Sequence, residues 1–100
     1  MTNKFILQRM DSHFKYLMNK IENSNNKELF RSTWLIAKSI IEQNIELSPR
    51  EVAKKIDKLH QMLMSTHENN NTNKKYEDLA FEVVLDIIYQ TDSNFLEGNS

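Results

Sequence analysis

Carboxylates recur at four-residue intervals near the end of the sequence, at Asp78, Glu82 and Asp86. In a helix this spacing places the three side chains on one face, one turn apart. Paired catalytic carboxylates need contrasting environments, which an exposed helix face does not provide, so the spacing does not indicate acid–base catalysis. It indicates either a solvated face partly neutralised by lysines of a neighbouring helix or a binding surface for a basic partner. Asp92 and Glu97 extend the same charge towards the C-terminus.

The other residues that could bind a metal or a phosphate group, or act as a nucleophile, lack the spacing that such sites require. The three histidines, His13, His60 and His67, do not pair at the i, i+3 or i+4 spacing that puts two metal ligands on one helix face. The chain has no cysteine, and its single glycine leaves neither a phosphate-binding loop nor a nucleophile elbow. We therefore predict no enzymatic activity, no metal and no cofactor. His60 falls at the edge of an apolar stripe, where we expect a hydrogen-bonded core histidine.

One segment raises the alternative of nucleic-acid binding. Residues 46–56, ELSPREVAKKI, resemble the capped opening helix of many helix-turn-helix domains, and the basic residues of such a helix can meet phosphates. These basic residues are Arg50, Lys54, Lys55 and Lys58. After Ile56, however, the apolar spacing continues as one helix, with no glycine turn and no visible recognition helix. A small helix-turn-helix-like, nucleic-acid-associated regulator is therefore the second interpretation, and the sequence disfavours nucleic acid as a partner.

Positioning these residues requires helices, because one glycine and one proline in 100 residues are too few for the turns of a β-sheet protein. The most apolar stretch, residues 76–90, carries apolar side chains around more than half of its helical circumference, which predicts a helix enclosed by others. Apolar residues at helical spacing predict four helices in all. Their expected ranges are 3–21, 27–45, 49–65 and 74–90.

The clearest helix boundary lies in the middle of the chain. Ser48 and Glu51 have the spacing of a capping box, and Pro49 between them suits the first helical position, where its missing N–H has no intrahelical partner. Leu47 can pack on Val52 across this start. The segment therefore predicts a helix that begins at Pro49.

Polar segments predict the remaining boundaries. The asparagine-rich residues 23–26 and the polar residues 67–73 are expected to be connectors, because such side chains compete with helical hydrogen bonds. We expect residues 91–94 to break the last helix and Phe95 and Leu96 to fold back onto the bundle. The sequence thus predicts an all-α, four-helix bundle-like single domain with a short C-terminal tail.

Aromatic residues fall both on and off the apolar stripes. Trp34, the only tryptophan, shares a core line with Phe30, and we expect it in the core rather than in a binding pocket. Ile36 is expected to widen that core. Phe5 and Tyr16 fall off the stripe of their helix near basic residues, either as ordinary surface residues or as anchors for a partner.

Length, composition and charge bound the class of protein. One hundred residues suffice for one domain with one core. The absence of cysteine fits a reducing compartment, and the sequence has neither a signal-peptide core nor a run of about 18 apolar residues for a membrane span. We expect a cytoplasmic protein with no membrane partner. All thirteen Lys and Arg lie within residues 1–75, so the acidic last helix either cancels basic neighbours or faces a partner.

The length, the lack of cysteine, the helical character and the acidic last helix, YEDLAFEVVLDIIYQTD, together resemble small bacterial immunity proteins. Those proteins neutralise nuclease toxins delivered between competing bacteria, as in contact-dependent growth inhibition and colicin systems. The resemblance implies a protein-binding inhibitor that covers the basic active site of a cognate nuclease toxin with an acidic face. On this interpretation the partner-binding residues are Asp78, Glu82, Asp86, Asp92 and Glu97. A helical homodimer is a further alternative.

Overall fold

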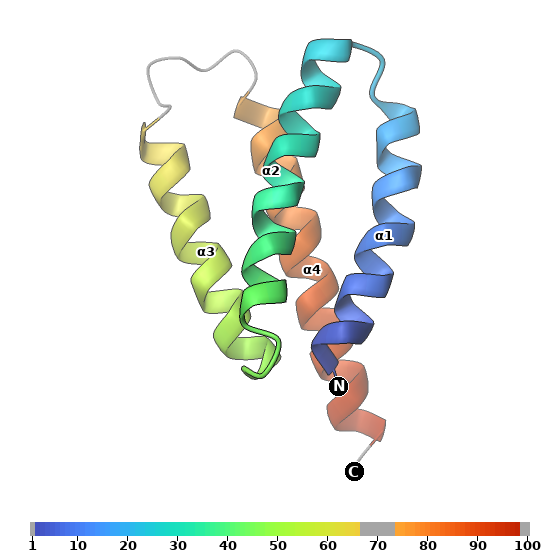
Figure 1. Ribbon diagram of the computed structural model, residues 1–100, viewed down its shortest axis with the longest axis vertical. Helices are drawn as coiled ribbons and strands as arrows, with labels where there is room; N and C mark the ends of the chain where they lie inside the picture. Colours follow the sequence, from blue (N-terminus) through green and yellow to red (C-terminus); the bar gives the residue numbers. More distant parts are fainter. Residues whose placement is uncertain (1, 67–73, 99–100) are drawn as a thin grey trace.

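The computed structural model describes residues 2–66 and 74–98, and within them the side-chain surroundings of residues 3–65 and 74–92. Four helices account for nearly all of these residues, and no strand occurs among them. The helices are α1 (Thr2–Lys20), α2 (Ser24–Gln43), α3 (Pro49–Thr66) and α4 (Lys74–Gly98). The predicted all-α, four-helix bundle-like domain is confirmed (Figure 1).

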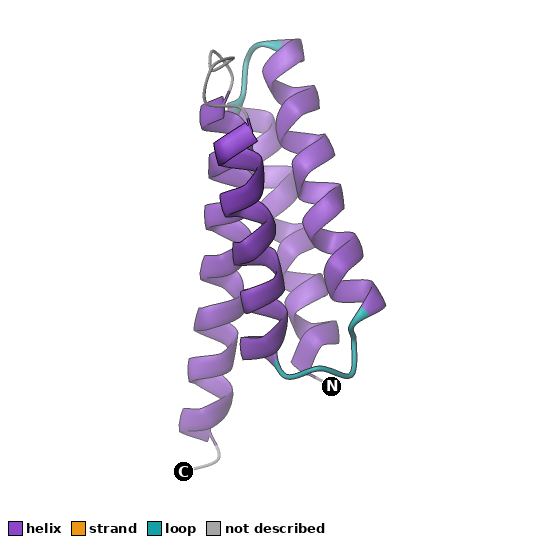
Figure 2. Cartoon of the chain, turned by 90° about the vertical axis from the view of Figure 1, so that its left-hand side faces the viewer, coloured by secondary structure: helices purple, strands orange, loops and turns teal. Residues whose placement is uncertain are grey.

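Successive helices run in opposite directions, and α2 and α4 form the centre of the bundle. Helix α4 packs against the other three helices, and its most extensive contacts are with α2 and α3. Helices α1 and α3 lie on opposite sides of the α2/α4 pair, as Figures 1 and 2 show from perpendicular directions. The prediction that residues 76–90 form a helix enclosed by others is confirmed.

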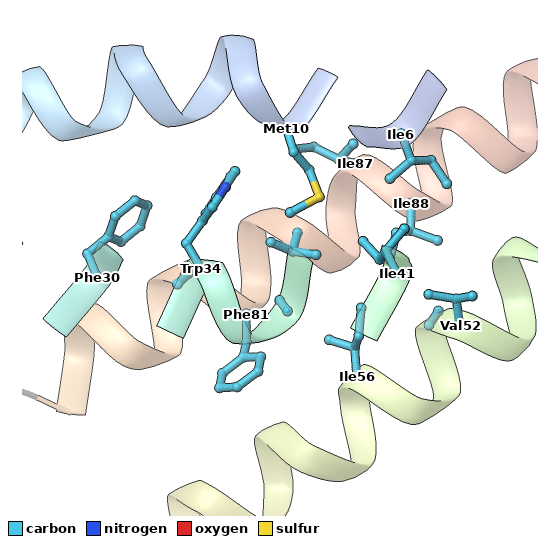
Figure 3. Packing of buried hydrophobic residues seen from close by; sticks show 14 of the residues in the cluster. Ile6, Met10, Phe30, Trp34, Ile41, Val52, Ile56, Phe81, Ile87 and Ile88 are labelled. Atoms are coloured by element: carbon cyan, nitrogen blue, oxygen red, sulfur yellow. The ribbon is translucent and has the colours of Figure 1, made fainter. Parts of the chain in front are cut away.

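One apolar core runs along the centre of the bundle (Figure 3). Trp34 and Phe30 of α2 are buried, and Trp34 extends towards α1, whereas Phe81 of α4 extends towards α3. Both central helices therefore place their large aromatic rings against the flanking helices. The prediction that Trp34 belongs to the core is confirmed, but Ile36 does not widen the core as expected, because 45% of it is exposed.

Helix α2 begins three residues earlier than predicted, at Ser24. The side-chain Oδ1 of Asn23 accepts hydrogen bonds from the backbone N–H groups of Asn25 at 2.9 Å and Asn26 at 3.1 Å. Two of the helix's otherwise unpaired N–H groups are thereby satisfied. The asparagine-rich segment is thus a cap and a first turn as well as a connector.

The side chain of Asn3 ties the start of α1 to the connector between α2 and α3. Its Nδ2 lies 3.3 Å from the carbonyl oxygen of Asn44, 3.1 Å from that of Ile45 and 2.7 Å from that of Leu47. Asn3 is buried, so its amide replaces the water that these carbonyls would otherwise bind. Helix α1 therefore holds in place the connector that leads into α3.

The predicted break after residue 90 is wrong, because α4 continues as a helix to Gly98. Tertiary contacts hold the polar residues in the helix: Thr91 is buried, and the carboxylate of Asp92 pairs with Arg50 of α3. Such contacts outweigh the weak intrinsic preference of these residues for turns. The last turns of α4 extend past the neighbouring helices instead of folding back (Figure 1), and the side chains of Phe95 and Leu96 lie outside the described residues.

The predicted cap of α3 is present at Ser48. The backbone N–H of Glu51 donates to Ser48 Oγ at 3.3 Å, and the N–H of Val52 donates to the Ser48 carbonyl at 3.1 Å. Ser48→Ala removes the Oγ acceptor and is expected to lower the free energy of unfolding by about 1 kcal/mol, whereas Ser48→Asp should retain most of the stability. Urea unfolding of the two variants measures this difference, and equal stabilities would contradict the capping role.

Candidate functional site

Two carboxylates of α4, those of Glu82 and Asp86, are exposed on the outer face of the bundle. Asp86 Oδ2 accepts a hydrogen bond from Gln90 Nε2 at 3.5 Å, and this contact involves no compensating charge. Among residues 3–65 and 74–92, no ion pair engages either carboxylate. Both side chains project from the helix that packs against all three of the others.

Asp78, the third residue of the predicted stripe, is engaged within the fold. Its Oδ1 lies 2.6 Å from Nε2 of His60 on α3, and the side chains of Asp78 and His60 are 39% and 15% exposed. The imidazole ring also stacks on Phe81, with a centroid distance of 4.9 Å. The expectation of a hydrogen-bonded histidine at the edge of the core is therefore confirmed, and its partner is a residue that we expected to face solvent.

Asp92 is engaged in the same way nearer to the other end of α3. The Nε of Arg50 lies 3.1 Å from Asp92 Oδ2, and the Asp92 side chain is only 16% exposed. The predicted Glu97 lies outside the residues whose side chains are described. The structure thus brings Glu82 and Asp86 together on one exposed face, whereas Asp78 and Asp92 tether α4 to α3.

The outer face of α4 also carries an aromatic residue that the sequence analysis did not single out. Tyr89 follows Asp86 by three residues and Glu82 by seven, so all three side chains share one face of the helix. Tyr89 is 51% exposed. Its exposure could have been predicted from its spacing, because Tyr89 falls within the acidic stripe, on the side of the helix that faces away from the core.

Helix α1 borders this face. Nη2 of Arg9 donates to Oε1 of Gln90 at 3.3 Å, which places that side of α1 beside the exposed side of α4. Phe5 and Tyr16 lie four residues before and seven residues after Arg9, and therefore on the same side of α1. They are 53% and 59% exposed, so the expectation that these aromatics leave the core is confirmed.

The lysines of α3 form no described ion pair with Glu82 or Asp86. Lys54, Lys55 and Lys58 are exposed, and none of them forms a described ion pair with α4. Helix α3 continues without interruption from Pro49 to Thr66, so no turn follows Ile56 and no separate recognition helix begins there. The expectation that this segment departs from the helix-turn-helix pattern after Ile56 is confirmed.

No triad of metal-ligating side chains occurs within the part of the chain that the structure describes. None of the helices in that part combines the length and the apolar character needed to cross a bilayer. Comparisons with protein-family models, with curated proteins and with solved structures gave no match to this chain. The exposed carboxylates of Glu82 and Asp86 on the outer face of α4 are therefore the candidate binding residues.

Proposed function

We propose that this protein is a protein-binding inhibitor, an immunity protein that covers the basic active site of a cognate nuclease toxin with the acidic outer face of α4. The observation that carries the proposal is the difference between the acidic residues of this helix. Asp78 and Asp92 are bonded to α3, whereas Glu82 and Asp86 are exposed with no described ion pair. Among the described residues, the latter two carboxylates are therefore available to a partner without the loss of an ion pair or of a described side-chain contact between helices.

Physical reasoning favours a binding role for this pair. Like charges one turn apart destabilise a helix by roughly 0.2–0.5 kcal/mol. Among the described residues, neither Glu82 nor Asp86 forms an ion pair that would offset this repulsion. An acidic helix face competes with phosphate groups for a cationic active site and accelerates encounter by electrostatic steering. Both properties suit an inhibitor that must reach a nuclease before its substrate does.

The direct test is inhibition of a nuclease encoded by the neighbouring gene. The purified product of that gene is incubated with DNA and RNA substrates, and this protein is added in increasing amounts. Loss of cleavage at one equivalent, with a complex detected by calorimetry, is the expected result. Absence of both a complex and inhibition at about 10 μM, far above the dissociation constant of a specific interface, would contradict the proposal. Sequence-selective binding of duplex DNA would instead favour the regulator.

A further inference from the structure

We infer that the outward face of α2 is an interface between two copies of this chain, which pack antiparallel about a two-fold axis near Ile36. The inference goes beyond the proposed function and does not depend on it. The members of this face are Ser32, Leu35, Ile36, Ser39 and Gln43. They fall within an arc of about 100° around the helix, opposite the side that enters the core. The buried apolar residues on that opposite side are Phe30, Trp34, Ala37 and Ile41.

The outward face of α2 carries apolar side chains and no charge. Leu35 and Ile36 lie at its centre and are each 45% exposed, and the other three members are polar but uncharged. The outward faces of the other helices are charged, through the exposed residues Lys4, Lys15, Lys54, Lys58, Glu82 and Asp86. Depletion of charged residues around exposed apolar side chains is typical of the centre of a protein interface.

Two opposite charges, those of Arg31 and Glu42, border this face on one side. They are eleven residues apart, close to three full turns, so both lie along the same flank of α2. Lys38, which pairs with Asp11 of α1 at 3.3 Å, identifies this flank as the one nearer to α1. Arg31 contacts Glu28 of its own helix at 3.1 Å, whereas Glu42 forms no ion pair among the described residues. Both side chains are exposed.

A two-fold axis perpendicular to α2 would pair these opposite charges between two copies. Such an axis reverses the direction of the second helix and keeps equal flanks on the same side, so residues before Ile36 come level with residues after it. Arg31 precedes Ile36 by five residues and Glu42 follows it by six, a mismatch of about 1.5 Å in height. Arg31 of each copy therefore lies opposite Glu42 of the other, as flanking charges do in paired helices. This self-complementarity favours a second copy of the chain over an unrelated partner.

The position of α2 in the bundle leaves the candidate binding residues uncovered in such a dimer. Helix α2 lies in front of α4 in the view of Figure 1, and the two helices make the most extensive contact in the bundle. Their outward faces consequently point in opposite directions. Glu82 and Asp86 of both copies remain exposed, so dimerisation and binding of a nuclease are compatible.

The first test is sedimentation equilibrium between about 5 and 500 μM protein, a range that covers weak dimers. We expect a reversible equilibrium between one and two copies. Ile36→Glu should raise the dimer Kd at least about tenfold, because it brings two carboxylates together at the centre of the interface. The matched control is Phe5→Glu, which places the same charge at a residue of α1 that is 53% exposed, and it should change Kd by less than about twofold.

The second test reverses the flanking charges. Arg31→Glu and Glu42→Arg should each raise Kd by about fivefold, because either substitution places like charges opposite each other at two symmetric positions. The double variant Arg31→Glu, Glu42→Arg restores the opposite pairing in the reverse sense and should return Kd to within about twofold of the unmodified protein. Thermal melts run in parallel separate this effect from the loss of the contact between Arg31 and Glu28.

Four results would overturn the inference. The first two are the mass of a single chain at every concentration and a dimer that Ile36→Glu leaves unchanged. The third is dimerisation that Phe5→Glu abolishes, which would place the interface on α1. The fourth is a loss in the two single charge variants that the double variant does not restore, which would exclude the antiparallel arrangement. None of these results bears on inhibition of a nuclease, so the two proposals succeed or fail separately.

Discussion

Trp34→Ala is expected to lower the free energy of unfolding by about 3–5 kcal/mol, because the surrounding helices cannot fill the space that the indole leaves. Trp34 is 2% exposed, and its ring centroid lies 5.4 Å from that of Phe30 and 5.6 Å from that of Phe14. The residue therefore joins α1 to α2. Domains of this size are stabilised by roughly 5–15 kcal/mol, so the substitution removes a large part of the margin.

Urea unfolding followed by far-ultraviolet circular dichroism measures this loss, since the variant lacks tryptophan fluorescence. The melting temperature should fall by at least about 12 °C. Leu35→Ala is the matched control, because Leu35 is adjacent in sequence, 45% exposed, and expected to contribute less than about 1 kcal/mol. A loss of less than about 1 kcal/mol for Trp34→Ala would contradict the packing of the aromatic cluster.

The core could be predicted because apolar spacing reports directly which side of a helix avoids water. Residues 76–90 were expected to be enclosed, and Ala80, Phe81, Val84, Ile87 and Ile88 are all buried. The start of α3 could be predicted for a different reason. Its capping residues act within a few positions of one another, so no tertiary information is needed to recognise them.

The partners of charged and polar side chains could not be predicted, because periodicity does not specify which helices are neighbours. Asp78 has the same spacing as Glu82 and Asp86, yet its carboxylate is bonded to His60 of α3. Asp92 stood in a predicted helix break, and its pairing with Arg50 instead accompanies the continuation of α4. Both errors have one physical origin, a contact with a residue far away in the sequence. Asp78 is bonded to a residue 18 positions away and Asp92 to one 42 positions away, and local sequence patterns do not report such contacts.

These contacts also determine which acidic residues can be substituted in a binding experiment without disturbing the fold. Reversing Asp78 would disrupt the contact with His60, so an effect on association would be confounded by an effect on the fold. Glu82 and Asp86 form no such contact with another helix among the described residues. They are therefore the two positions of the predicted stripe at which charge can be changed with little effect on stability.

Replacing Glu82 and Asp86 together by lysine is expected to weaken association with the basic partner by at least about 3 kcal/mol, more than a hundredfold in Kd. The reason is that each substitution removes an attraction and juxtaposes like charges across the interface. The thermal melt of the free protein should change little, because both side chains are exposed. The association rate of the unmodified protein should also fall as salt rises, because screening weakens the steering field.

The matched control is the double variant Lys54→Glu, Lys58→Glu, which reverses two exposed charges on α3 instead of α4. Its added negative charge should leave Kd nearly unchanged and slightly accelerate association with a basic partner. Calorimetry and stopped-flow binding to the product of the neighbouring gene, with melts run in parallel, measure all three proteins. If the α4 variant binds as tightly as the unmodified protein and melts at the same temperature, Glu82 and Asp86 are ordinary solvated surface. If the α3 variant loses as much affinity as the α4 variant, the loss is not specific to the outer face of α4.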